Sequence, residues 1–285
     1  MTGRLSGKVA VVTGGTRGLG LAIARLYGSE GAKVVVASRT ASSVTAAVES
    51  LRKDGVDAAG RACDVSVRAD VEALRQLALD TYGRLDIWVN NAGLGGVFGP
   101  TVDVPEEDFV AVVGTNVLGT YHGTVAALET MLPQGSGHIL NILGRGDTGP
   151  VPFQSAYGAS KSWVRAFTLA VATENADSGV RVHALNPGLV QTDLLTHVDA
   201  LPGTEHQLAR LPLISTMWGL PPERAALPAL DLVLSSTREH RALRLPQVLS
   251  RTVSHLVRRL THRAPTPQPL DIRLVERRGT RRPRE

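Results

Sequence analysis

The apolar positions of residues 8–190 alternate between short continuous runs and longer stretches with helical spacing. The short runs are rich in Val and Ile and are bounded by Gly or polar residues, a pattern typical of strands buried on both faces. These predicted strands cover residues 8–13, 33–38, 85–90, 138–143 and 180–185. Helices are predicted between them, over residues 19–30, 41–54, 67–82, 106–131 and 155–178.

The order of these elements predicts the fold class. Strand–helix–strand units repeated at this period form a parallel sheet with right-handed crossovers. We therefore expect an α/β chain, with a single-domain Rossmann-type doubly wound parallel sheet and helices on both faces. Ligands of such folds bind at the carboxyl ends of the strands.

The segment 189–222 is less regular and mixes apolar residues with turn formers. Because it follows a strand end, a mobile lid over the substrate is favoured over an irregular helix pair. A further helix is predicted over 222–235. We accordingly expect a domain over 1–237 that includes the lid, followed by a C-terminal extension over 238–285.

The extension has its own pattern. Leu and Val recur along one face of a predicted amphipathic helix over 244–262. Pro residues make 265–269 a stiff break, 271–275 is compatible with a short strand, and 277–285 has the composition of a frayed end.

Composition excludes several classes of protein. A chain of 285 residues with 43% hydrophobic and 20% charged residues is globular over most of its length. The single cysteine, Cys63, excludes a disulfide framework and a Cys-based zinc site, and His122, His138 and His183 lack metal-ligand spacing, so no metal is expected. No apolar run reaches the roughly 20 residues of a membrane span, and the N-terminus lacks a signal-peptide pattern. We expect a cytoplasmic protein.

The net charge of +5 is unevenly distributed, because residues 238–285 carry thirteen Arg against four acids. The chain has 27 Arg and only four Lys, so an Arg-rich genome is the alternative explanation for part of this bias. The extension has no aromatic residue for base stacking and no recognised DNA-binding motif, so nucleic acid is not an expected partner. A helix that faces an oligomer or solvent is favoured, with an anionic membrane surface as the third alternative.

A glycine-rich turn follows the first strand as Thr13-Gly-Gly-Thr-Arg-Gly-Leu-Gly20. Gly14, Gly18 and Gly20 allow a sharp turn and close approach of a pyrophosphate to the next helix's N-terminus. Between a strand and a helix, this turn predicts a dinucleotide site; the alternative is a tight structural turn.

The end of the second strand bears on cofactor preference. It reads Val36-Ala-Ser-Arg39, without the acid that holds a ribose 2′-hydroxyl in NAD sites. Arg39 and Arg17 supply cations for a 2′-phosphate, which favours NADP(H), while solvated surface arginines are the alternative.

Tyr157 and Lys161 are spaced i, i+4 at the start of a predicted helix, which places phenol and ammonium on one face. The cation is expected to lower the pKa of Tyr157 and so to suit it for general acid catalysis.

Six ordered motifs complete the picture. They are Thr13-Gly-x3-Gly-x-Gly20, Cys63-Asp-Val65, Asn90-Asn-Ala-Gly93, Asn116, Tyr157-x3-Lys161 and Asn186-Pro-Gly188. Over about residues 5–235 the chain resembles the classical short-chain dehydrogenase/reductase family. The resemblance implies Tyr157 as proton donor, Lys161 on the nicotinamide ribose and Asn116 organising a relay water. It also implies a homodimer or homotetramer built on helices 106–131 and 155–178. The implied cofactor-binding residues are Gly14, Thr16, Arg17, Gly18, Leu19, Gly20, Ser38, Arg39, Asp64, Val65, Asn91, Ala92, Gly93, Tyr157, Lys161, Pro187, Gly188, Val190 and Thr192.

The chain departs from the family at one catalytic position. The family's serine, thirteen residues before the tyrosine, corresponds to Gly144, and the usual final strand is not recognisable after Ser236. We expect Thr148 or Arg145 to orient the substrate, or a bulky substrate to supply its own hydrogen bond.

The sequence therefore predicts an NADP(H)-dependent oxidoreductase for a small carbonyl or alcohol substrate, with reduction as the expected direction. The alternative is a cofactor-binding sensor, a scaffold or a non-redox acid–base enzyme. The segment 189–222, including Met217 and Trp218, is expected to line a moderately apolar pocket.

Overall fold

The computed structural model describes residues 3–242, 252, 267 and 269–276. Within these residues the main sheet has seven parallel strands in the order β3-β2-β1-β4-β5-β6-β8. The strands are β1 Val9–Thr13, β2 Lys33–Ser38, β3 Ala58–Ala62, β4 Ile87–Asn90, β5 Gly137–Ile142, β6 Val180–Asn186 and β8 Glu239–Arg241. This is the doubly wound order of a Rossmann-type fold, so the predicted fold class is confirmed.

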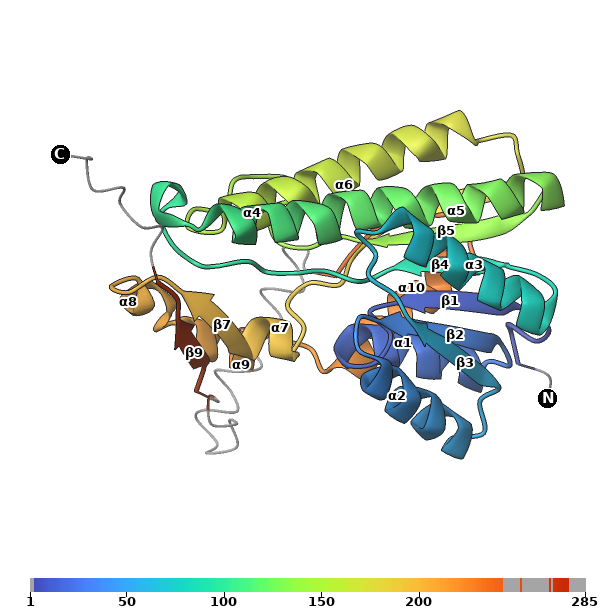
Figure 1. Ribbon diagram of the computed structural model, residues 1–285, viewed down its shortest axis with the longest axis horizontal. Coiled ribbons are helices and arrows are strands. Elements are labelled where there is room, and N and C mark those ends of the chain that lie inside the picture. Colours follow the sequence, from blue (N-terminus) through green and yellow to red (C-terminus); the bar gives the residue numbers. More distant parts are fainter. Residues whose placement is uncertain (1–2, 243–251, 253–266, 268, 277–285) are drawn as a thin grey trace.

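Helices cover both faces of the sheet (Figure 1). Side chains alternate along each strand, so Val34 and Val36 pack on one layer of helices while Val35 and Ala37 pack on the other. The first layer contains α1 Gly18–Ser29, α2 Ala41–Lys53 and α10 Pro222–Val233. The second contains α3 Arg68–Tyr82, α5 Gly119–Gln134 and α6 Ser155–Glu174.

The predicted helix over 106–131 is interrupted. It consists of α4 Glu106–Val112, a π-helical turn Val113–Leu118 and α5, and a short 3-10 turn Thr101–Asp103 precedes it. A π-helical turn inside a helix is a frequent feature of functional sites, and this one contains Asn116.

Strand β8 lies where no final strand was recognisable. Its residues, Glu-His-Arg, have no apolar pattern, yet they pair in parallel with β6 at the edge of the sheet. The sheet therefore extends across the boundary at 237 that the sequence suggested.

The residues between β6 and α10 form, together with strand β9, a small lobe beside the main sheet (Figure 1). It comprises α7 Asp193–Thr196, β7 His197–Ala200, α8 Glu205–Leu208, α9 Leu211–Trp218 and β9 Asp271–Leu274. Strand β9 agrees with the short strand expected over 271–275, and it pairs in parallel with β7. The predicted helix over 244–262 and the frayed end over 277–285 lie outside the described residues, except for Thr252.

Candidate active site

The glycine-rich turn joins β1 to α1 at the carboxyl end of the sheet. Gly14 and Gly18 have φ angles of +60° and +53°, which side chains disfavour. The Asn91 amide donates to the carbonyls of Thr13 and Gly14 at 3.0 and 3.1 Å and so fixes the turn from β4. No side chain caps α1, and no acid lies in its first turn. The helix N-terminus beside Thr16 and Leu19 is therefore suited to a pyrophosphate.

The expected adenosine side of the site lies at the ends of β2 and β3. Arg39 is exposed. The pKa of Asp64 is below its ordinary value, mainly because the Ser66 hydroxyl donates a hydrogen bond to this carboxylate and to a lesser degree because of the charge of Arg39. Arg17 instead forms an ion pair with Asp193 of α7 at 2.6 Å. Arg39 therefore lies near enough to Asp64 to act on its charge, while the ion pair directs Arg17 toward the small lobe.

Tyr157 and Lys161 lie at the start of α6. The Lys161 ammonium donates to the Ile142 carbonyl at 3.0 Å and lies 5.7 Å from the centre of the Tyr157 ring. Burial lowers the pKa of Lys161 to about 8, and burial, helped by Asp147 and opposed by Arg145, raises the pKa of Tyr157 to about 12. The expectation of a lowered tyrosine pKa is therefore wrong, because the loss of solvent and the charge of Asp147 outweigh the positive charge of Arg145.

The π-helical turn directs the Asn116 side chain toward α6. Its amide donates to the Leu94 carbonyl and the Ser160 hydroxyl, both at 3.0 Å, and its oxygen accepts from the Leu94 N–H at 2.8 Å. Asn116 and Lys161 meet at Gly93, where a Cβ would lie 3.4 Å from the amide oxygen and 3.8 Å from the ammonium. The structure thus brings together these two predicted residues and Gly93, which follows Ala92.

The Asn186-Pro-Gly188 turn closes the other side of the site. The Asn186 side chain accepts from the Gly188 N–H at 2.9 Å and donates to the Gly144 carbonyl at 3.3 Å. Beyond Pro187 and Val190 the chain reaches Thr192, whose methyl group would lie 3.0 Å from a Cβ on Gly18. The ends of β1 and β6 therefore face the same space.

Gly144 faces the tyrosine–lysine pair. A Cβ on this residue would overlap the Tyr157 hydroxyl oxygen and lie 3.5 Å from Cε of Lys161. Arg145 and Thr148, the two residues expected to take over from a serine, have exposed side chains in the same loop. Their role in orienting substrate stays a prediction.

A cavity of about 390 Å³ opens beside Tyr157. Its walls are formed by residues 95–112 and 153–157, including Val97, Phe109 and Phe153. Phe153 has a φ of +66°, an unusual angle for a bulky residue and one that indicates a constrained site. Sequence reasoning missed Phe153, because it lies in an irregular loop without periodicity.

None of the described residues of the segment 189–222 lines this cavity, although Leu194 would lie 3.5 Å from a Cβ on Gly95 in its wall. The expectation that Met217 and Trp218 line the substrate pocket stays a prediction. The small lobe packs instead behind the loop that follows β4: Phe98 pairs with Ala200, and Leu201 would block a Cβ on Gly99. The lobe supports the cavity wall from outside.

Two negative findings apply to the part of the chain that the structure describes. It contains no group of three or more His, Cys, Asp or Glu side chains placed to hold a metal ion. It also contains no helix of the length and hydropathy needed to cross a membrane.

The chain is similar to known reductases. A family model described as short chain dehydrogenase matches residues 8–201. A provisionally named ketoacyl reductase of Streptomyces coelicolor is 40% identical over 193 residues, which cover 67% of this chain and 74% of that protein.

Two solved structures share the fold. A variant of the actinorhodin polyketide ketoreductase with NADPH has a TM-score of 0.76 at 32% identity, covering 85% of this chain and 97% of that chain. The 3-ketoacyl-(acyl-carrier-protein) reductase of Brucella melitensis, complexed with NADH, has a TM-score of 0.71 at 33% identity, covering 80% and 91%.

Proposed function

This chain belongs to the short-chain dehydrogenase family, and we propose that it is an NADP(H)-dependent oxidoreductase that reduces a carbonyl substrate. The observation that carries the proposal is the position of Lys161, which lies beside Asn116 at Gly93 and beside Tyr157 at Gly144, with Tyr157 in the wall of a cavity. The uncapped N-terminus of α1 adds a place for the cofactor's phosphates. A protein that only binds a nucleotide has no need of this arrangement of proton-handling groups.

The residues present fit a nicotinamide dinucleotide. The turn from Gly14 to Gly20 and the N-terminus of α1 would hold the pyrophosphate, and Lys161 would hold the nicotinamide ribose. Asp64 and Val65 would flank the adenine, and Val190 with Thr192 would contact the carboxamide. The bound nicotinamide supplies the hydride.

The chain's own residues handle the proton. With its raised pKa, Tyr157 remains protonated at neutral pH and can donate to the oxygen of a substrate in the adjoining cavity. Lys161, still mostly charged at neutral pH, stabilises the phenolate that remains. Asn116 holds the backbone of Leu94 by two hydrogen bonds. It thereby positions the short segment between Gly93, which lies beside Lys161, and Gly95, which lines the cavity.

The preference for NADP(H) rests on Arg39. It is an exposed cation at the end of β2, where an acid would repel a 2′-phosphate. Solved structures that share the fold carry NADPH in one case and NADH in another, so the proposal depends on this residue.

The cavity suits a moderately apolar carbonyl compound. Phe109, Phe153 and Val97 contribute apolar surface, while Thr101 and Ser155, hydrogen-bonded to each other at 2.9 Å, contribute hydroxyls. Since the similar proteins include ketoacyl reductases, ketone-bearing acyl compounds are the first substrate class to test.

The test is oxidation of NADPH with a panel of ketones, including ketoacyl thioesters, by the protein and by Tyr157→Phe. We expect turnover by the former only, with equal NADPH binding by both in a fluorescence titration. Tight binding without turnover of any ketone would instead favour the sensor, scaffold or non-redox alternative, which the absence of a side chain at Gly144 supports.

We also propose a homo-oligomer that buries the outer faces of α5 and α6. Tyr121, Phe167 and Trp163 form an aromatic row there, with ring centroids 6.1 and 4.7 Å apart, and Tyr121 and Trp163 are 44% and 36% exposed. Light scattering of Tyr121→Glu and Trp163→Glu variants should show a smaller mass than that of the unmodified protein.

A further inference from the structure

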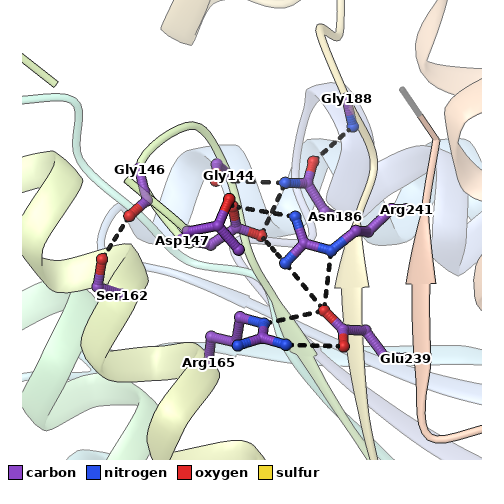
Figure 2. Close-up of polar contacts among 10 residues, drawn as sticks. Gly144, Gly146, Asp147, Ser162, Arg165, Asn186, Gly188, Glu239 and Arg241 are labelled. Atoms are coloured by element: carbon purple, nitrogen blue, oxygen red, sulfur yellow. Dashed lines mark hydrogen bonds and ion pairs between the residues drawn. The ribbon is translucent and has the colours of Figure 1, made fainter. Parts of the chain in front are cut away.

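The carboxylate of Asp147 is buried close to the candidate catalytic pair. Its side chain is only 4% exposed, and it lies in the loop between β5 and α6, three residues after Gly144. Asn186 donates to it at 2.9 Å, and the Arg241 guanidinium approaches both carboxylate oxygens, at 3.3 and 3.0 Å (Figure 2). A buried carboxylate is costly unless it is paired in this way.

The ion pair of Asp147 and Arg241 is the buried end of a row of four side chains with alternating charges. Glu239 contacts Arg241 at 2.9 Å, and Arg165 of α6 forms a two-pronged contact with Glu239 at 3.0 and 3.2 Å (Figure 2). Arg241 and Glu239 belong to β8, the strand that has no apolar pattern. These polar residues therefore have a role at this edge of the sheet: they join the loop of Asp147 to α6.

The same loop is fastened to α6 at a second point. The Ser162 hydroxyl donates to the Gly146 carbonyl, and a Cβ on Gly146 would overlap the backbone of Gly158, the residue after Tyr157. Gly146 adopts a φ of +102° there. The backbone from Gly144 to Asp147 is thus held directly against the turn of α6 that carries Tyr157.

We propose that Asp147 is a positioning residue of the active site, whose buried carboxylate, balanced by Arg241, fixes the loop against Tyr157 and sets the local charge. This inference rests on the oxidoreductase function proposed above. Asp147 acts through other residues, because the described partners of its carboxylate are Asn186, Arg241 and Thr148.

The charge of Asp147 acts on both members of the catalytic pair. It raises the pKa of Tyr157, with burial as the larger cause and Arg145 opposing it, and it counteracts the burial that lowers the pKa of Lys161. Asp147 also helps to raise the pKa of Arg165, after Glu239. Removing the anion should therefore lower the pKa of Lys161, and removing its counter-cation Arg241 should raise it.

The experiment compares Asp147→Asn with Arg241→Met. Asparagine keeps the shape and the bond from Asn186, and methionine keeps the length of the arginine stem. Arg241→Lys retains the charge and should restore the unmodified behaviour in large part. Arg238→Met, which removes an exposed arginine from the segment before β8, is the matched control.

The readout needs no substrate. The chain has four lysines, so the carbon-13 signals of labelled lysine give the pKa of Lys161, assigned with a Lys161→Arg variant. We expect the Lys161 pKa to fall by up to about one unit in Asp147→Asn and to rise by up to about one unit in Arg241→Met. The control should leave it unchanged. In ketone reduction, the pH at which kcat/KM declines should move in the same two directions.

Opposite shifts would support a role in setting charge, and a purely structural salt bridge would not produce them. If both variants lower the melting temperature but leave the Lys161 pKa unmoved, or move it in the same direction, the inference is overturned. Because the lysine titration does not depend on turnover, failure of the proposed enzymatic function would appear separately, in the ketone panel.

Discussion

The hydroxyl of Tyr157 occupies the space into which a side chain on Gly144 would extend. Because residue 144 has no side chain, the phenol proposed as the proton donor can occupy this position beside the cavity. A serine introduced at residue 144 would displace the hydroxyl before it could bond a substrate.

This relationship predicts the result of adding a side chain. Gly144→Ala and Gly144→Ser should each lower kcat by about 10²-fold, because a displacement of about 1 Å is enough for such a loss. Gly149→Ala, where a Cβ meets nothing within 4 Å, is the control in the same loop and should keep full activity. Strong new activity of Gly144→Ser on many ketones, from a protein otherwise inactive, would identify a disabled reductase.

Arg39 should decide the cofactor preference. We expect NADPH to bind at least about tenfold tighter than NADH, a difference of roughly 1.4 kcal/mol. Arg39→Met should lose this difference, and Arg39→Asp should reverse it, because a carboxylate repels the 2′-phosphate and accepts a bond from the ribose. Fluorescence titration checks this, and equal affinities in the unmodified protein would refute it.

The ion pair between Arg17 and Asp193 gives an independent test of the proposed 2′-phosphate site. If a 2′-phosphate takes Arg17 from Asp193, Asp193→Asn should raise affinity for NADPH while leaving that for NADH unchanged. The gain should stay below about fivefold, since an exposed pair contributes at most about 1 kcal/mol. Equal changes for both cofactors would show that Arg17 does not reach the phosphate.

The sequence predicted the parts of the fold that burial controls. The central strands carry continuous Val and Ile runs, and the observed β2 has the predicted bounds, because a strand covered on both faces tolerates little else. Strand β3, Ala-Ala-Gly-Arg-Ala, lacked that signal. A Cβ on its Gly60 would overlap Val44 of α2 and crowd Val48, so close helix packing requires a small residue there.

Polar elements escaped prediction for a different reason. Strand β8 and Asp147 are stabilised by ion pairs between segments about 90 residues apart, and no local pattern reveals such partners. The tyrosine pKa was misjudged because spacing along a helix reports the neighbouring cation but not the loss of solvent.

Strand β9 should be needed for the small lobe. It pairs with β7, adds Ile272 to the cluster around Phe98 and Leu208, and joins Arg273 to Asp199 at 2.6 Å. Removing residues 270–285 should lower the melting temperature and raise KM for the substrate, because the lobe supports the loop that forms a wall of the cavity. Removing 277–285 alone leaves β9 in place and should change neither quantity. Identical melting of the two truncated proteins would contradict this role.

The direction of the reaction should determine the sign of the pH dependence. With its pKa lowered to about 8 by burial, Lys161 loses its charge as the pH rises through that value, whereas Tyr157, raised to about 12, stays protonated. Reduction needs the protonated phenol and the neighbouring cation, so its kcat/KM should be level below pH 8 and decline above it. Alcohol oxidation needs the phenolate as base beside the Lys161 cation, so its rate should rise with pH up to about 8 and level off above it.

The same pKa shift affects stability. Between pH 8 and about 10.5, the ordinary lysine pKa, the folded protein binds fewer protons at Lys161 than the unfolded chain, so this group's contribution to stability increases with pH. Rates of reduction and oxidation, measured from pH 6 to 10 on one preparation, check the rate prediction. In Lys161→Met the decline of reduction kcat/KM above pH 8 should be absent. A reduction rate that rises through pH 8 would show that Lys161 is not the group whose charge the reaction requires.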